Sequence, residues 1–170
     1  LSTQVGCSLS CRFCSTGKMG FIRNMTAGEI LGQVMVAKDF LRSESQDDKI
    51  RNLVFMGMGE PLLNTESVMK AIHVLTQSEG LAWSPRRITL STAGIIPEIR
   101  RLAINNPGIN LAVSLNGADD KTRSRLMPIN KKYPLNDLMT VLKDFPLSSQ
   151  QQHITFEYVM SKGSEVMAEG

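Results

Sequence analysis

Short runs of Val, Ile and Leu alternate along this chain with stretches whose apolar residues recur at helical spacing. A strand followed by a helix, repeated several times, is typical of βα units around a mostly parallel sheet. The apolar runs predict five strands, at residues 2–5, 52–56, 87–91, 110–115 and 154–159, and the strand at 52–56 is expected to be buried. The pattern therefore predicts an α/β fold of about five βα units, in one domain spanning residues 1–170 without a linker.

The stretches of helical period predict the elements between these strands. A capping box formed by Thr26 and Glu29 marks the start of the first helix, because hydroxyl and carboxylate can each satisfy a free backbone N–H. Its apolar face is formed by Ile30, Leu31, Val34 and Leu41. We expect helices at residues 26–41, from about 64, after 92–94 with Pro97 in the first turn, and at 136–145 between Pro134 and Pro146, with residues 119–125 following the fourth strand. The polar residues 43–48 predict a loop.

Composition places the chain among soluble globular proteins, with 42% hydrophobic and 21% charged residues. No run of eighteen apolar residues is present, and residues 1–6 lack the basic and apolar regions of a secretory signal. We expect a cytoplasmic, monomeric protein without membrane contact. The net charge of +3 is compatible with an RNA partner but does not demonstrate one.

The two ends of the sequence predict a fragment. The first residue is Leu1 rather than a methionine, and residues 161–170 are too short to complete another βα unit. We expect a domain truncated at both ends, whose sheet or barrel lacks its C-terminal part.

Three cysteines, Cys7, Cys11 and Cys14, lie within eight residues, and the chain contains no other. An odd number so closely spaced argues against a disulfide framework. Iron–sulfur clusters used for electron transfer usually have four thiolate ligands, so three would leave one iron of a four-iron cluster open to a substrate. The alternative is a structural zinc site, for which only His73 or His153 could be the fourth ligand.

Polar residues follow three later strands at the edge where α/β proteins collect their sites. Gly59 and Glu60 follow the second strand, Ser91 ends the third, and Ser114 with Leu115 and Asn116 ends the fourth. Glycine permits close approach of a ligand, and a carboxylate can pair with an ammonium group. Taken singly, these residues are also compatible with turns and helix caps.

The spacing C-x-x-x-C-x-x-C resembles the signature of the radical S-adenosylmethionine (SAM) family. The resemblance implies a 4Fe-4S cluster on three cysteines, whose open iron binds the amino and carboxylate groups of SAM. It also implies a partial (β/α)6-type barrel. An aromatic residue in the position of Phe13 commonly lies beside the adenine in this family, although Phe13 is also compatible with core packing.

Five further blocks resemble the dual-specificity RNA methyltransferases, which modify adenine C2 in 23S ribosomal RNA and transfer RNA. They are residues 5–17, 20–24, 56–64, 86–94 and 127–133. The resemblance implies Cys7, Cys11 and Cys14 as cluster ligands, and as SAM contacts Gly59, Glu60, Ser91, Ser114, Leu115 and Asn116. Many members have His in place of Asn116. A SAM contact through the backbone of this residue would survive that exchange, whereas the side-chain contact is not implied for Asn. An electron donor such as flavodoxin is also implied.

The family's methyl-carrying and resolving cysteines have no counterpart in this sequence, so we expect no catalytic residue here and at most binding of cluster and SAM. Two alternatives stay open: a related adenine-C8 methyltransferase that confers antibiotic resistance, and a zinc-stabilised RNA-binding module. Basic residues could contact RNA phosphates. The candidates are Lys18, Arg23, Arg86, Arg87, Arg123, Arg125, Lys131 and Lys132.

Overall fold

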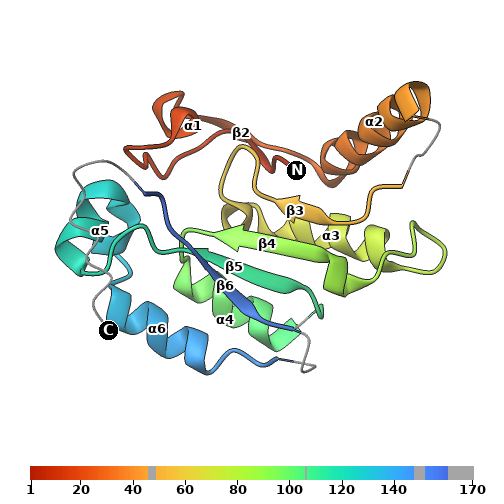
Figure 1. Cartoon of the computed structure of the whole chain (residues 1–170). Coiled ribbons are helices and arrows are strands. Elements are labelled where there is room, and N and C mark those ends of the chain that lie inside the picture. The colour runs from red at the N-terminus through yellow and green to blue at the C-terminus, as the bar shows by residue number, and fades with distance from the viewer. Residues whose placement is uncertain (46–48, 106, 148–151, 161–170) are drawn as a thin grey trace.

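The computed structural model describes residues 1–45, 49–105, 107–147 and 152–160. At its centre is a four-stranded parallel sheet with the strand order β3-β4-β5-β6 (Figure 1). The strands are β3 (Leu53–Phe55), β4 (Ile88–Thr92), β5 (Asn110–Ser114) and β6 (Ile154–Glu157). The predicted α/β class with a mostly parallel sheet is confirmed.

Helices separate these strands along the chain. In Figure 1, α4 and α6 lie below the strands, and α2 lies at the upper right, beyond β3 at the edge of the sheet. The helices are α1 (Ser15–Lys18), α2 (Ala27–Ser45), α3 (Thr65–Thr76), α4 (Ile96–Asn105), α5 (Asp120–Leu126) and α6 (Leu135–Lys143). The described residues also include three 3-10 turns: η1 (Pro61–Leu63), η2 (Pro85–Arg87) and η3 (Pro128–Lys131). Each predicted helix is present, with bounds that differ by a few residues.

The core fills the space between the helices and one face of the sheet. In β4, Ile88 and Leu90 are fully buried, whereas Thr89 and Ser91 between them are only half-buried. The prediction of a buried strand at residues 52–56 is half wrong, because Val54 is 41% exposed and Met56 44% exposed. Helices of the described chain cover only one face of the sheet, and alternate side chains point to opposite faces.

The first predicted strand has a different partner from the others. Strand β1 (Gln4–Gly6) pairs antiparallel with β2 (Phe21–Asn24), and the two form a hairpin outside the four-stranded sheet. Backbone bonds still hold the chain before this hairpin against the end of β3, since Thr3 N donates to Met58 O at 2.9 Å. The cysteine loop that connects β1 with α1 is thereby held over the sheet.

Helix α2 begins with the predicted capping box. Glu29 N donates to Thr26 Oγ1 at 3.2 Å, and Thr26 N donates to Glu29 Oε2 at 2.8 Å. The predicted apolar face is buried at Ile30 and Val34. The helix continues to Ser45, so the loop predicted from residue 43 starts too early; residues 46–48 of that prediction, like 161–170, lie outside the described part of the chain.

No helix among the described residues is long and apolar enough to cross a membrane.

Candidate functional site

A cavity of about 240 Å³ lies at the carboxyl ends of the parallel strands, beneath the cysteine loop. The arrow of β4 points to this edge, at the left of Figure 1, where α1 and α5 also lie. Six segments supply its walls: the cysteine loop, the ends of β3, β4, β5 and β6, and the end of α5, as expected for the edge at which strand-end loops meet. The polar or sulfur-bearing lining residues are Cys7, Cys11, Cys14, Glu60, Ser91, Thr92, Ser114, Met127 and Glu157, with Met56 at the rim of β3.

The three cysteines line this one cavity, and none forms a disulfide. Two backbone bonds shape their loop: Cys7 N donates to Gly20 O at 2.9 Å, and Cys14 N donates to Cys11 O at 3.1 Å. A third, from Arg12 N to Leu126 O at 2.9 Å, attaches the loop to the end of α5. The loop is thus fixed at both sides of the cavity.

Burial and repulsion from neighbouring negative charges disfavour the thiolate form of Cys7 and Cys11 in the metal-free protein. Burial raises the pKa of Cys7, and burial together with the neighbouring Cys7 and Cys14 raises the pKa of Cys11 to about 11. A bound cation reverses this balance, because thiolates are the form that ligates metal. Within the described chain, no three His, Cys, Asp or Glu side chains stand in a preformed metal-binding group. The donor set suits an iron–sulfur cluster once its sulfur atoms are drawn together.

Glu60 is buried, and its carboxylate accepts three hydrogen bonds from the protein. Its Oε1 accepts from Thr92 Oγ1 at 2.7 Å and from Leu62 N at 3.1 Å, and its Oε2 accepts from Ala93 N at 2.8 Å. The carboxylate therefore joins the loop after β3 to the loop after β4. Burial raises its pKa. The sequence predicts that this carboxylate pairs with a ligand's ammonium group. Such a pair would need the lone pairs of the carboxylate that do not already accept from these three protein donors.

Gly59 permits a close approach within the protein. Its φ is +95°, and a Cβ there would lie 2.5 Å from the Cβ of Gln4. Gln4 Oε1 in turn accepts from Glu60 N at 2.9 Å. The glycine thus lets β1 pack against the loop that carries Glu60.

Ser91 and Ser114 end neighbouring strands and share one acceptor. Glu157 Oε2 accepts from Ser91 Oγ at 2.8 Å and from Ser114 Oγ at 3.2 Å. Glu157 is not among the residues predicted for the site, because it lies inside the predicted fifth strand at residues 154–159. The observed strand β6 ends at Glu157, so only the structure places this carboxylate at a strand end.

The remaining predicted contacts lie in different places. Phe13 lines the cavity and is 40% exposed. Leu115 and Asn116 are absent from the lining. The buried side chain of Asn116 accepts from Val159 N at 2.8 Å, and the residue has a φ of +54°. Asn116 therefore serves the loop after β5, where its conformation suits an Asn.

Neither histidine lies at the cysteine cavity. His73 is exposed in α3 beside Gln77, and His153 is exposed just before β6, at the opposite ends of the strands. The chain has no other histidine. In this arrangement a histidine does not provide the fourth ligand that a structural zinc site needs.

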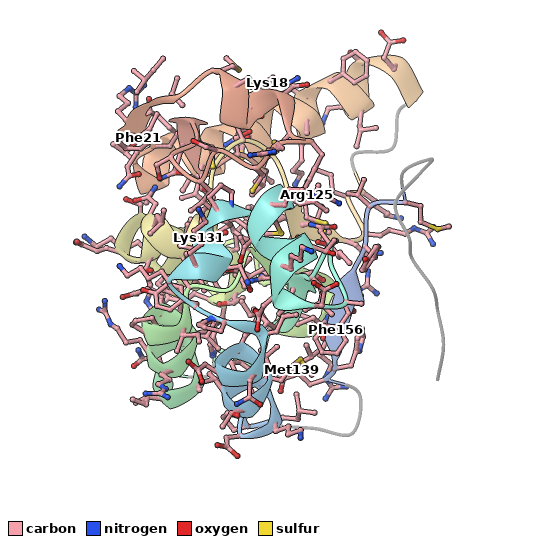
Figure 2. The ribbon with its side chains drawn as sticks, turned by 90° about the vertical axis from the view of Figure 1, so that its left-hand side faces the viewer. Lys18, Phe21, Arg125, Lys131, Met139 and Phe156 are labelled. Carbon is pink, nitrogen blue, oxygen red and sulfur yellow. The ribbon has the colours of Figure 1, made fainter. Side chains whose placement is uncertain are left out.

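The basic candidates for RNA contact separate into two groups. Arg123 is fully buried, so its selection as an RNA contact is wrong: it donates to the carbonyls of Leu115, Ala93 and Ser114 and to Asn130 Oδ1. Arg23 is occupied by Glu29, at 2.7 Å and 2.9 Å. Lys18, Arg125 and Lys131 are exposed and lie on the face viewed in Figure 2, above the strand ends. Arg86, Arg87 and Lys132 are also exposed.

Comparison with known proteins identifies the same family over nearly the whole chain. Residues 1–163 match the model of the radical SAM superfamily. The chain is 50% identical to a dual-specificity RNA methyltransferase RlmN of Parvibaculum lavamentivorans, over 96% of this chain and 42% of that protein. It is 50% identical to the RlmN of Syntrophobacter fumaroxidans, over 96% of this chain and 46% of that protein.

A solved structure, of a radical SAM methyltransferase from Sphaerobacter thermophilus, has the same fold. It superposes with a TM-score of 0.89 at 42% identity, over 96% of this chain and 47% of that one. The chain thus spans less than half the length of these relatives. The three cysteines that line a cavity at the strand ends agree with this structural likeness and with the family match. The chain belongs to the radical SAM superfamily.

Proposed function

We propose that this chain is the core domain of a longer RNA methyltransferase, which methylates C2 of adenine in 23S ribosomal RNA and transfer RNA. The observation that carries the proposal is the convergence of Cys7, Cys11 and Cys14 with the polar strand ends on one cavity. The relatives of similar sequence carry the name dual-specificity RNA methyltransferase.

In this proposal, Cys7, Cys11 and Cys14 hold a 4Fe-4S cluster, and the cavity beneath them holds SAM. When bound, these groups supply a one-electron cleavage that yields a carbon-centred radical. The protein's own part is to bind, orient and shield. Gly59, Glu60, Ser91 and Ser114 border SAM directly, Phe13 covers its adenine, and Leu115 and Asn116 act through their backbone.

RNA would approach from the face that carries the cavity. Lys18, Arg125 and Lys131 lie on this face (Figure 2), where their charges can meet backbone phosphates. An exposed cation contributes to RNA binding chiefly through counterion release, so RNA affinity should fall steeply with salt. We further propose a cytoplasmic monomer that receives electrons from a donor such as flavodoxin.

The cluster is tested by anaerobic reconstitution of the chain with iron and sulfide. We expect brown protein whose absorbance and reduced paramagnetic signal are lost in Cys11→Ala and kept in Ser8→Ala, an exposed neighbour in the same loop. Added SAM should alter the paramagnetic signal. Uptake of one zinc ion with no iron would overturn the proposed cluster and favour a zinc-stabilised module.

The site of methylation is tested on the longer protein. Nuclease digestion of modified RNA and mass spectrometry against standards should give 2-methyladenosine. A product that co-elutes with 8-methyladenosine would replace C2 with the related C8 activity.

A further inference from the structure

Glu157 joins three strand ends that are far apart in the sequence. It ends β6, lies opposite Ser114 in the register of β5 and β6, and reaches Ser91 at the end of β4. The bond from Ser91 to Glu157 spans 66 residues. All three side chains line the cysteine cavity and are half-buried.

The bonds to Glu157 fix what the two serines can offer a ligand. A hydroxyl has one proton and two lone pairs. Because Ser91 and Ser114 both donate their proton to Glu157 Oε2, their oxygens face the cavity as acceptors. A carboxylate is likewise a hydrogen-bond acceptor only. The group recognises ligand O–H or N–H donors, and it repels a carboxylate or phosphate.

Glu157 keeps one oxygen for a ligand. Within the described residues, Oε1 of Glu157 has no hydrogen-bond partner, whereas both oxygens of Glu60 accept from the protein. No Lys or Arg is among the residues that line the cavity. A half-buried carboxylate oxygen without a donor favours a ligand that supplies one.

The position of Glu157 on the sheet selects the part of the ligand. β3, which precedes Gly59 and Glu60, and β6 are the two edges of the four-stranded sheet, about 14 Å apart at the usual strand spacing. A SAM molecule whose amino-acid end lies beside the loop after β3 extends its nucleoside toward β5 and β6. The ribose there carries two neighbouring hydroxyl donors, which suit a carboxylate flanked by two serine oxygens.

We propose that Glu157 is a SAM-binding residue that accepts hydrogen bonds from the ribose hydroxyls, with Ser91 and Ser114 oriented by it. This inference rests on the proposed function, since it takes SAM as the ligand. It assigns a role to a residue that the family resemblance did not include, and it places the recognition of the sugar at the end of β6.

Titration calorimetry on the anaerobically reconstituted chain tests the proposal. The ligands are SAM and its 2′-deoxy and 3′-deoxy analogues, and the proteins are the natural chain, Glu157→Ala and Glu157→Gln. Glu79→Gln, an exposed position in the loop after α3, is the matched control. Circular dichroism and iron content show that each variant is folded and loaded.

In the natural chain and the control, loss of a ribose hydroxyl should weaken binding at least about tenfold, as expected for a hydrogen bond to a charged group. In Glu157→Ala, SAM and the deoxy analogue should bind within about threefold of each other, because the acceptor is gone. A structural role alone would weaken all ligands equally and leave their ratio unchanged.

Three outcomes decide the matter. Loss of discrimination in Glu157→Ala supports the proposal. Where the alanine variant does not fold, weaker discrimination in Glu157→Gln supports it, because the neutral amide oxygen is a poorer acceptor than a carboxylate. An unchanged ratio between the affinities for SAM and for the deoxy analogues overturns it. If the natural chain loads its cluster but binds no SAM, the proposed function fails together with this inference.

Discussion

Arg123 is a fully buried cation beside the cavity, and it holds three loops in place. Its guanidinium donates to the carbonyls of Ala93, Ser114 and Leu115, which belong to the loops after β4 and β5, and to Asn130 in η3. Burial lowers its pKa, and neighbouring Asp120 opposes the shift. Carbonyl dipoles and a side-chain amide therefore take the place of a direct ion pair.

Replacing Arg123 should be costly, because its partners would lose their donors without gaining access to water. We expect Arg123→Leu to lower the free energy of unfolding by about 3 to 5 kcal/mol, in line with the removal of one member of a buried charged network. Urea denaturation measures this loss. Arg100→Leu, at an exposed position of α4, should cost less than about 0.5 kcal/mol; equal costs for the two changes would contradict the role assigned to Arg123.

At the scale of the element, the start of α2 combines a capping box with an ion pair. Glu29 accepts from Thr26 N and from both terminal nitrogens of Arg23, so it links the helix to β2. These bonds, chiefly the one from Arg23, lower the pKa of Glu29 from 4.5 to about 2. Since both side chains are exposed, salt screens part of this interaction.

The lowered pKa gives the stabilisation by Glu29 a defined pH dependence. Its contribution is complete above about pH 4.5 and is lost as the pH falls from there to about 2, because protonation then removes the charge that the folded state favours. Glu29→Gln should therefore be less stable than the natural chain at pH 7, with a difference that shrinks at pH 3 and in 1 M salt. Urea denaturation at both pH values gives the difference, and one that grows toward acid pH would contradict the assignment.

The hairpin that precedes the cysteine loop depends on Gly6. Its φ is +78°, and a Cβ at this position would overlap the carbonyl oxygen of Gly20, which accepts from Cys7 N. The glycine therefore sets the point at which the chain leaves β1 and enters the loop.

Gly6→Ala should lower the free energy of unfolding by about 1 to 3 kcal/mol through backbone strain and the clash. It should also reduce iron uptake, because it displaces Cys7. Gly32→Ala is the matched control: nothing lies within 4 Å of its added Cβ, and in the interior of α2 it should stabilise by about 0.5 to 1 kcal/mol. Denaturation curves and iron content report both effects, and full iron uptake by Gly6→Ala would refute the dependence.

At the scale of the whole molecule, the cavity connects elements from both ends of the described chain. It takes residues from the β1 hairpin loop, from the ends of β3, β4, β5 and β6, and from the end of α5. A ligand that contacts all of these should stabilise the native fold as a unit, because it binds the native state and not the unfolded chain.

SAM should therefore raise the unfolding temperature of the reconstituted chain. At a free concentration of about 100 times its Kd, the stabilisation is about 2.7 kcal/mol, which corresponds to roughly 5 to 10 °C for a domain of this size. Differential scanning calorimetry measures the shift. Adenosine at the same concentration, which lacks the amino-acid end, should give a smaller one, and equal shifts would show that the cluster side of the cavity contributes nothing.

Much of the fold could be read from local pattern. The parallel strands and the helices between them followed from hydrophobic period, and the start of α2 followed from Thr26 and Glu29. The errors concern features that depend on strand pairing and on packing between elements. Strand β1 pairs with an antiparallel partner, and Val54 is exposed because helices cover only one face of the sheet. Such choices depend on contacts between distant segments, which a local pattern does not contain.

The sequence by itself determined that three thiols share one loop and that polar residues end the strands, since spacing and strand ends are local properties. Only the tertiary structure decided which of these side chains meet. In the folded chain, Ser91 and Ser114 donate to Glu157, the carboxylate of Glu60 accepts hydrogen bonds from the protein, and Arg123 is buried among carbonyls. The physical reason is that a hydrogen bond between residues 30 to 66 positions apart forms only where the sheet brings the ends of its strands together.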